Sequence, residues 1–124
     1  DVPKFARWME MVRDRGLDWE THILAGVIPI RAVGMARYMQ SSVPGVYVPD
    51  ETIARMKAAL DRAGDDKEKK AQFQKEEGVK IMLELIDQVK NIPGVHGVHI
   101  MAVGWEDIVP VLAEKAGFLP RPQD

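Results

Sequence analysis

Three histidines are the first side chains in this 124-residue sequence whose chemistry suggests a site. His96 and His99 lie three positions apart, and in a strand they would point to opposite faces. Such a pair does not easily hold one ion, and neither a cysteine nor an HExxH motif supplies further ligands. We therefore predict no metal site. His22 is predicted to be a hydrogen-bonded residue at the junction before a strand.

Other familiar catalytic patterns are missing from the sequence. The GxGxxG and GxxxxGK[ST] spacings do not occur, which argues against a dinucleotide or nucleotide phosphate site. No Ser-His-Asp or paired-carboxylate arrangement can be assigned from spacing. The absence of cysteine excludes disulfides and thiol catalysis, and it fits a reducing cytosol. None of these patterns assigns a catalytic residue, and we expect a cytoplasmic protein.

Gly104-Trp105 is the pair whose position points most directly to binding. It follows an apolar segment that ends at Val103, and ligands of parallel α/β folds lie beyond the carboxyl ends of the strands. An indole at such an end can stack on a planar ring, and Gly104 allows a ligand to approach the backbone. A second interpretation stays open, in which Trp105 only covers the rim of the sheet.

The hydrophobic pattern predicts the elements that position these residues. The run 23–30 is apolar without alternation, which is typical of a strand covered on both faces, and Pro29 ends it. A short extended segment over 43–49 and a strand over 95–103 follow. Helices are expected over 3–16, 31–40, 50–60, 71–90 and 107–116, with Gly16 and Gly117 as stops. Residues 63–70 are charged and predict an exposed connection.

This order of elements predicts an α/β fold with about three parallel strands and five helices. Three parallel strands leave apolar edges unpaired, and the chain has about half of the roughly 250 residues of a closed (β/α)8 barrel. We therefore expect a fragment, a swapped assembly or a partner chain, with Asp1 as an internal residue because no Met precedes it. The net charge of −2 predicts that the chain does not bind nucleic acid. The absence of a long apolar run predicts that it does not span a membrane.

Five segments, in order along the chain, resemble the methylenetetrahydrofolate reductase family. Residues 23–30 are similar to its sixth barrel strand, and Val48-Pro49 with the following helix resembles its seventh strand and helix. The other matching segments are 77–81, 93–100 and 116–118. The resemblance implies a partial (β/α)8 TIM barrel, in which residues 1–124 form the C-terminal half of one barrel domain, from the fifth helix through the eighth.

The resemblance also implies a function. Members reduce 5,10-methylenetetrahydrofolate to 5-methyltetrahydrofolate through FAD, in one-carbon metabolism and methionine biosynthesis. The family's catalytic acid lies on the first strand and its main FAD contacts on strands one to five. The full-length parent is therefore expected to carry FAD and the folate substrate, whereas this chain alone is expected to bind no cofactor and to be inactive.

The folate and nicotinamide pocket is the part of the family's site that this chain is expected to retain. We take Pro29, Met56, Met101 and Trp105 as its substrate-binding candidates, with no catalytic role. Met101 stands where many members have Tyr, and Gly104-Trp105 stands where they have Asn-Arg. Loss of that Arg removes a fixed hydrogen-bond donor for a carboxylate or phosphate. This loss predicts either that the electron donor is not a nicotinamide or that the enzyme works with a partner subunit.

Two other functions remain open from the sequence. The chain is in one case a non-catalytic half-barrel that acts as an assembly or protein-interaction module, covering its strands by self-association or by binding the missing barrel half. In the other it belongs to a different barrel enzyme that shares only this architecture, because a fold does not fix a function.

Overall fold

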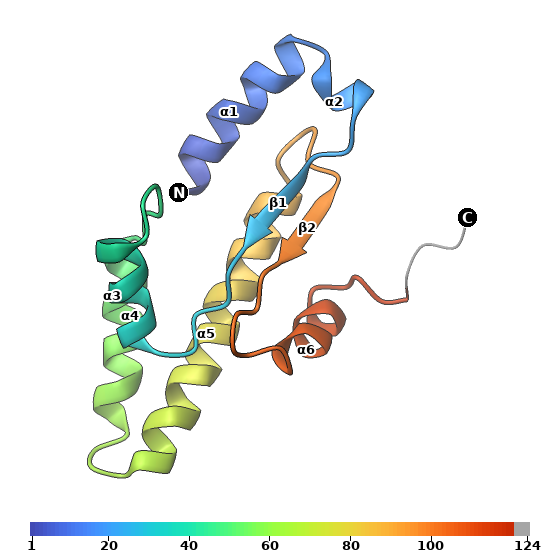
Figure 1. Cartoon of the computed structure of the whole chain (residues 1–124). Helices are drawn as coiled ribbons and strands as arrows, with labels where there is room; N and C mark the ends of the chain where they lie inside the picture. Colours follow the sequence, from blue (N-terminus) through green and yellow to red (C-terminus); the bar gives the residue numbers. More distant parts are fainter. Residues whose placement is uncertain (121–124) are drawn as a thin grey trace. The chain divides into compact units, whose positions relative to one another are not determined.

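The structure is a computed structural model that describes residues 1–120 and divides into two compact units. Unit 1 contains Asp1 and residues 29–81, and unit 2 contains residues 2–28 and the described residues from 82 onward. The elements in chain order are α1 (Val2–Asp14), α2 (Leu17–Glu20), β1 (Leu24–Val27), α3 (Val33–Ser42), α4 (Asp50–Arg62), α5 (Lys67–Lys90), β2 (Gly97–Ile100) and α6 (Ile108–Lys115) (Figure 1). Helix α5 supplies residues to both units.

The predicted helix stops at two glycines are confirmed. Gly16 follows α1 with a left-handed φ of 71°, and Gly117 follows α6 with a φ of 76°. After α6 the amide of Phe118 donates to the carbonyl of Ala113 at 2.9 Å, and that of Gly117 donates to Glu114 at 3.1 Å. This pair of bonds is a Schellman motif, which satisfies carbonyls left free at a helix end.

The strand predicted over 43–49 is wrong for the described chain, which contains two strands. The amide of Val46 donates to the carbonyl of Val43 at 3.2 Å, closing a turn in which Gly45 has a φ of 81°. Proline at the second position and glycine at the third favour this turn, and neither Pro44 nor Pro49 has an N–H for a ladder. The one-turn helix α2 was also not predicted, so the described residues form six helices.

The connection predicted over 63–70 is shorter than expected. Helix α5 already begins at Lys67, because the Asp66 carboxylate oxygen Oδ1 accepts hydrogen bonds from the amides of Glu68 and Lys69, both at 3.0 Å. A carboxylate in this position satisfies amides that lack a partner within the helix. The true connection is 63–66, and Lys67–Lys70 form the first turn of α5.

Substitution of Asp66 tests this helix start. Asp66→Ala is expected to lower the free energy of unfolding by about 1 kcal/mol, because two amides of α5 lose their acceptor. Asp65→Ala, one position earlier and also exposed, is the matched control and is expected to change it by less than about 0.5 kcal/mol. Urea denaturation measures both, and equal effects of the two variants would contradict the assigned cap.

Unit 1 packs α3, α4 and the first part of α5. Its interior includes Met39 of α3 and Met56 of α4, which is 0% exposed. Gln74, on α5, is the described polar residue that is buried, and both ends of its amide are bonded. Its Oε1 accepts from the amide of Val33 at 2.8 Å, and its Nε2 donates to the carbonyl of Lys70 at 2.9 Å. Gln74 therefore ties α5 to the first turn of α3.

Unit 2 contains the sheet. Strands β1 and β2 run parallel, with Leu24 opposite Gly97 and Val27 opposite Ile100 (Figure 1). Pro29 follows β1 closely, as expected for a residue that cannot donate to a ladder. The turn before β2 repeats the chemistry of the one after α3: the amide of Val95 donates to Ile92 at 3.1 Å, and Gly94 has a φ of 86°.

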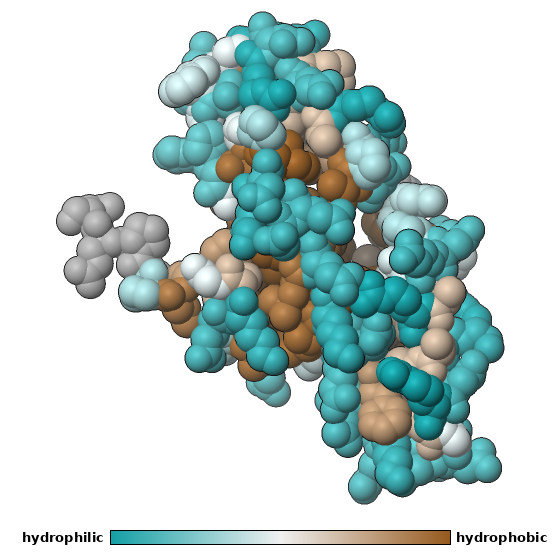
Figure 2. Space-filling model, turned by 180° about the vertical axis from the view of Figure 1, so that it is seen from behind, coloured by the Kyte–Doolittle hydropathy of each residue, from teal (hydrophilic) through white to brown (hydrophobic). Residues whose placement is uncertain are grey.

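The face shown in Figure 2 is mostly hydrophilic, with hydrophobic residues in patches. Trp19 and Val103 are among the large apolar side chains that stay exposed, at 90% and 72%. Within residues 1–120, no helix combines the length and the hydropathy needed to cross a bilayer.

Candidate ligand-binding surface

One face of the two-stranded sheet is exposed. On β1, Ala25 and Val27 are buried, whereas Leu24 and Gly26 are exposed. Successive side chains point to opposite faces, and directly paired residues of neighbouring strands share a face. The exposed face therefore consists of Leu24, Gly26 and their β2 partners Gly97 and His99; we call it the open face. The prediction that both faces of this strand are covered is wrong for the described chain.

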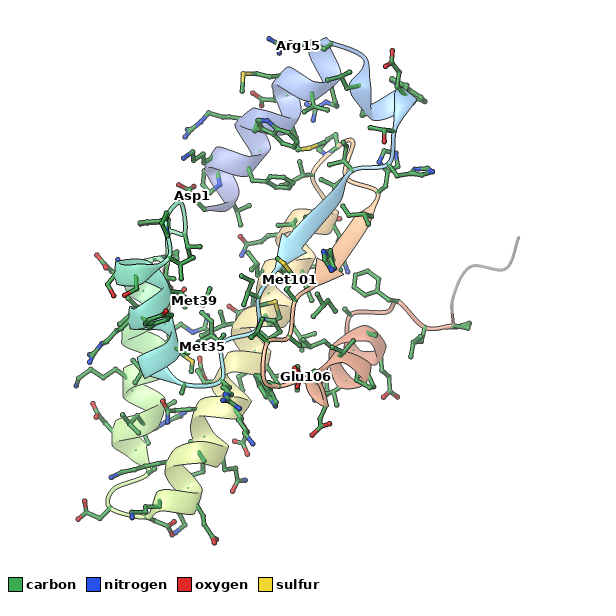
Figure 3. All side chains as sticks on the ribbon, viewed as in Figure 1. Asp1, Arg15, Met35, Met39, Met101 and Glu106 are labelled. Carbon is green, nitrogen blue, oxygen red and sulfur yellow. The ribbon has the colours of Figure 1, made fainter. Side chains whose placement is uncertain are left out.

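On the open face, apolar side chains pack closely against two glycines: Met101 against Gly26, and Leu24 against Gly97. A Cβ atom built on Gly26 would lie 2.9 Å from Met101 Cε, and one built on Gly97 would lie 3.1 Å from Leu24 Cδ2. Only a residue without a side chain allows such close approach without displacement. Met101, just beyond β2, therefore lies over the open face at its carboxyl end, beside the ends of both strands (Figure 3).

The segment after β2 forms a tight turn that carries Trp105. The amide of Trp105 donates to the carbonyl of Ala102 at 3.1 Å, and Gly104 has a φ of 67°. Glu106 Oε1 accepts from the amide of Gly104 at 2.9 Å and so fixes the turn (Figure 3). The side chain of Trp105 is half-buried. Stacking on a ligand and covering the rim both remain compatible with this placement.

The four predicted substrate contacts fall in different parts of the structure. Met101 and Trp105 lie together in unit 2, on the segment that follows β2. Pro29 and Met56 belong to unit 1, where both are buried. Met56 faces the interior of its unit with no exposed surface, so packing alone accounts for its position in α4. A substrate contact remains a prediction for all four.

The histidines have separate roles. His99 lies on the open face, whereas His96 precedes β2 and its Nδ1 accepts a hydrogen bond from the amide of Ile23 at 3.1 Å. A backbone N–H is always the donor, so the neutral ring carries its proton on Nε2. A histidine that ligates a metal through Nε2 needs the opposite tautomer. The junction bond predicted for His22 is made instead by His96, and the His22 ring packs edge-on against it, with centroids 5.0 Å apart.

Sequence reasoning missed the residues that define the open face. Phosphate-loop spacings do not include Gly26 or Gly97, and Leu24 is one residue of the apolar run 23–30. The available signal was the pair of glycines near the middle of one apolar strand and the start of the other, since an interior glycine in a strand indicates close approach of another group. Glu106 was also missed, because its role is to accept a backbone amide.

Comparison with known families decides the assignment of the chain. The family model of methylenetetrahydrofolate reductase matches residues 1–117. The chain belongs to the methylenetetrahydrofolate reductase family. No curated protein and no solved structure gives a match. The mixed α/β structure with parallel strands is compatible with the methylenetetrahydrofolate reductase family. Membership suggests an oxidoreductase of folate metabolism.

Flavin chemistry in this family raises the question whether these residues fit FAD. The open face presents Leu24, two glycines and His99, with Met101 lying over Gly26. None of these carries the permanent positive charge that a pyrophosphate favours, and the close approach that Gly26 permits is already taken by Met101. The open face therefore does not form a flavin site from its own residues.

Proposed function

We propose that this chain is the C-terminal half of a (β/α)8 barrel of a flavin-dependent enzyme that reduces 5,10-methylenetetrahydrofolate to 5-methyltetrahydrofolate. The family match over residues 1–117 carries the proposal. In the longer parent, FAD supplies hydride transfer, and the protein positions the folate. In this chain we propose Pro29, Met56, Met101 and Trp105 as residues that contact the folate. We place the enzyme in the cytoplasm, in one-carbon metabolism leading to methionine.

The one-sided burial of the sheet supports the barrel. A strand of a closed barrel has helices on its outer face and packed side chains on its inner face. Ala25 and Val27 are buried at 4% and 3%, whereas Leu24, on the other face, is 58% exposed. An apolar side chain this exposed on a parallel strand is unusual, because parallel sheets are normally covered on both faces. In a closed barrel, inner-face side chains of the other strands would supply the missing cover.

Absorbance spectroscopy tests the proposal. The longer parent is expected to purify with a flavin band near about 450 nm and to reduce methylenetetrahydrofolate. The 124-residue chain is expected to show neither property, because the proposed catalytic acid and FAD contacts lie outside it. A colourless parent that takes up no added FAD would contradict the proposal, and so would turnover by the isolated chain.

The exposure of Leu24 also favours a second candidate function, an assembly module without catalysis. We expect the isolated chain to self-associate through the open face and the free strand edges, because exposed apolar strands are templates for pairing. Leu24→Lys is expected to reduce the associated fraction seen by light scattering. Glu51→Lys, an exposed site on α4, is a control that adds a lysine elsewhere. A monomeric unsubstituted chain would contradict this expectation.

A further inference from the structure

The start of the sheet is held by an unusual pair of bonds between two residues. The amide of His96 donates to the carbonyl of Ile23 at 2.8 Å, and the amide of Ile23 donates to Nδ1 of the His96 ring at 3.1 Å. Ile23 and His96 thus add one closed pair next to the first ladder pair, Leu24 and Gly97. One bond of this pair is made by main-chain atoms alone, and the other depends on an imidazole lone pair.

The ring bond exists in only one charge state of His96. Neutral imidazole has one acceptor nitrogen, whereas protonated imidazole has two donors and no acceptor. Protonation at Nδ1 therefore places two donors opposite each other and breaks the bond from Ile23. The main-chain bond from His96 to Ile23 contains no titrating atom and survives.

His22 packs on this ring, and charged residues of α1 and α2 contact the turn that precedes it. His22, in the segment before β1, packs edge-on at 5.0 Å between ring centroids. On α1, Arg13 donates to the carbonyl of Pro93 at 2.7 Å, in the turn that leads to His96. On α2, Asp18 has its Cβ 3.3 Å from a Cβ built on Gly94, in the same turn. On β2 itself, His99 lies on the open face, and at the end of α5 Lys90 is paired with Asp87 at 3.0 Å.

We propose that His96 is a proton-sensitive lock on the Ile23–His96 pair at the start of the β1–β2 sheet. Both bonds of this pair form when the ring is neutral, and only the main-chain bond remains when the ring is protonated. His22 and His96 are both exposed to solvent, so protons reach their rings freely. Slippage by one residue would place Val95 or Gly97 opposite Ile23, and neither has a side-chain acceptor. The closed lock therefore also favours the observed register, and acidification weakens that preference.

Amide hydrogen exchange on the 124-residue chain tests the lock. When the pH is lowered from about 7.5 to about 5, the protection factor of the Ile23 amide is expected to fall about fivefold. This fold-change corresponds to the loss of one hydrogen bond. The His96 amide is the internal control and is expected to keep its protection. Unchanged Ile23 protection, or equal loss at both amides, would overturn the proposal.

Two variants and one spectrum separate His96 from other causes. In His96→Asn the side-chain Oδ1 replaces Nδ1 as an acceptor that does not titrate, so the Ile23 amide is expected to stay protected at both pH values. In His22→Gln the pH-dependent loss is expected to persist. Loss in His96→Asn, or its disappearance in His22→Gln, would contradict the assignment. Imidazole nitrogen chemical shifts at neutral pH are expected to show the Nε2–H tautomer at His96, and the Nδ1–H tautomer would overturn the lock directly.

Discussion

Met56→Ala is expected to lower the free energy of unfolding by about 2–5 kcal/mol, measured by urea denaturation. Met56 is 0% exposed in unit 1, so truncation removes a buried side chain and leaves a cavity. Met11→Ala is the control of the same residue type. Met11 is 49% exposed on α1, and its truncation is expected to cost less than about 0.5 kcal/mol. Equal effects would contradict the placement of Met56 in the core.

A conservative variant separates the core role of Met56 from its proposed pocket role. Met56→Leu keeps most of the buried volume, so the free energy of unfolding is expected to change by less than about 1.5 kcal/mol. In the longer parent, the proposed folate contact predicts a raised KM for this variant. An unchanged KM would leave Met56 with a packing role only and would remove it from the proposed pocket.

Gly94→Ala is expected to lower the free energy of unfolding by about 1–2 kcal/mol more than Gly45→Ala does. Both glycines follow a proline in the same kind of turn, with φ values of 86° and 81°. Each substitution therefore incurs the same cost of a left-handed backbone, roughly 1–2 kcal/mol. Only Gly94 is crowded: a Cβ there would lie 3.1 Å from Met9 Cε and 3.3 Å from Arg13 Cγ, whereas nothing lies within 4 Å of one on Gly45.

Thermal or urea unfolding of the two glycine variants gives the comparison directly. A larger loss for Gly94→Ala indicates that α1 packs tightly against the turn before β2, as the structure shows. Equal losses would mean that the neighbours of Gly94 move aside freely, and the described packing of α1 on this turn would be wrong.

Local chemistry explains which elements could be predicted from the sequence. The helix stops at Gly16 and Gly117 depend on a left-handed residue, and the end of β1 depends on a proline without an N–H; both signals are visible in the residues themselves. The start of α5 was misplaced because Asp66 was read as one charge among many instead of a helix cap. Residues 43–49 were misread because their apolar character outweighed the turn chemistry of Pro44-Gly45.

Predictions that depended on distant contacts were less successful. The open face carries the same kinds of residues as a covered strand, and exposure depends on what else is present to cover it. The bond from Ile23 to His96 joins residues 73 positions apart, so no spacing rule within one segment could identify it. Trp105 was predicted from its place at a strand end and Met101 from the family resemblance, and the structure puts both on the segment that follows β2.

Cysteine labelling of the open face tests the central claim, that this face is the inner wall of a barrel completed by residues outside this chain. The sequence has no cysteine, so Leu24→Cys introduces a unique thiol into the chain. Trp19→Cys is the control at a side chain that is 90% exposed. In the dilute isolated chain, both thiols are expected to react with a maleimide at similar rates.

The same two substitutions are then placed in the longer parent, with the labelled peptides quantified by mass spectrometry. The barrel predicts that Leu24→Cys becomes at least about tenfold slower to label while Trp19→Cys does not change, because only the inner wall gains cover. Equal labelling of Leu24→Cys in the isolated chain and in the parent would contradict the claim.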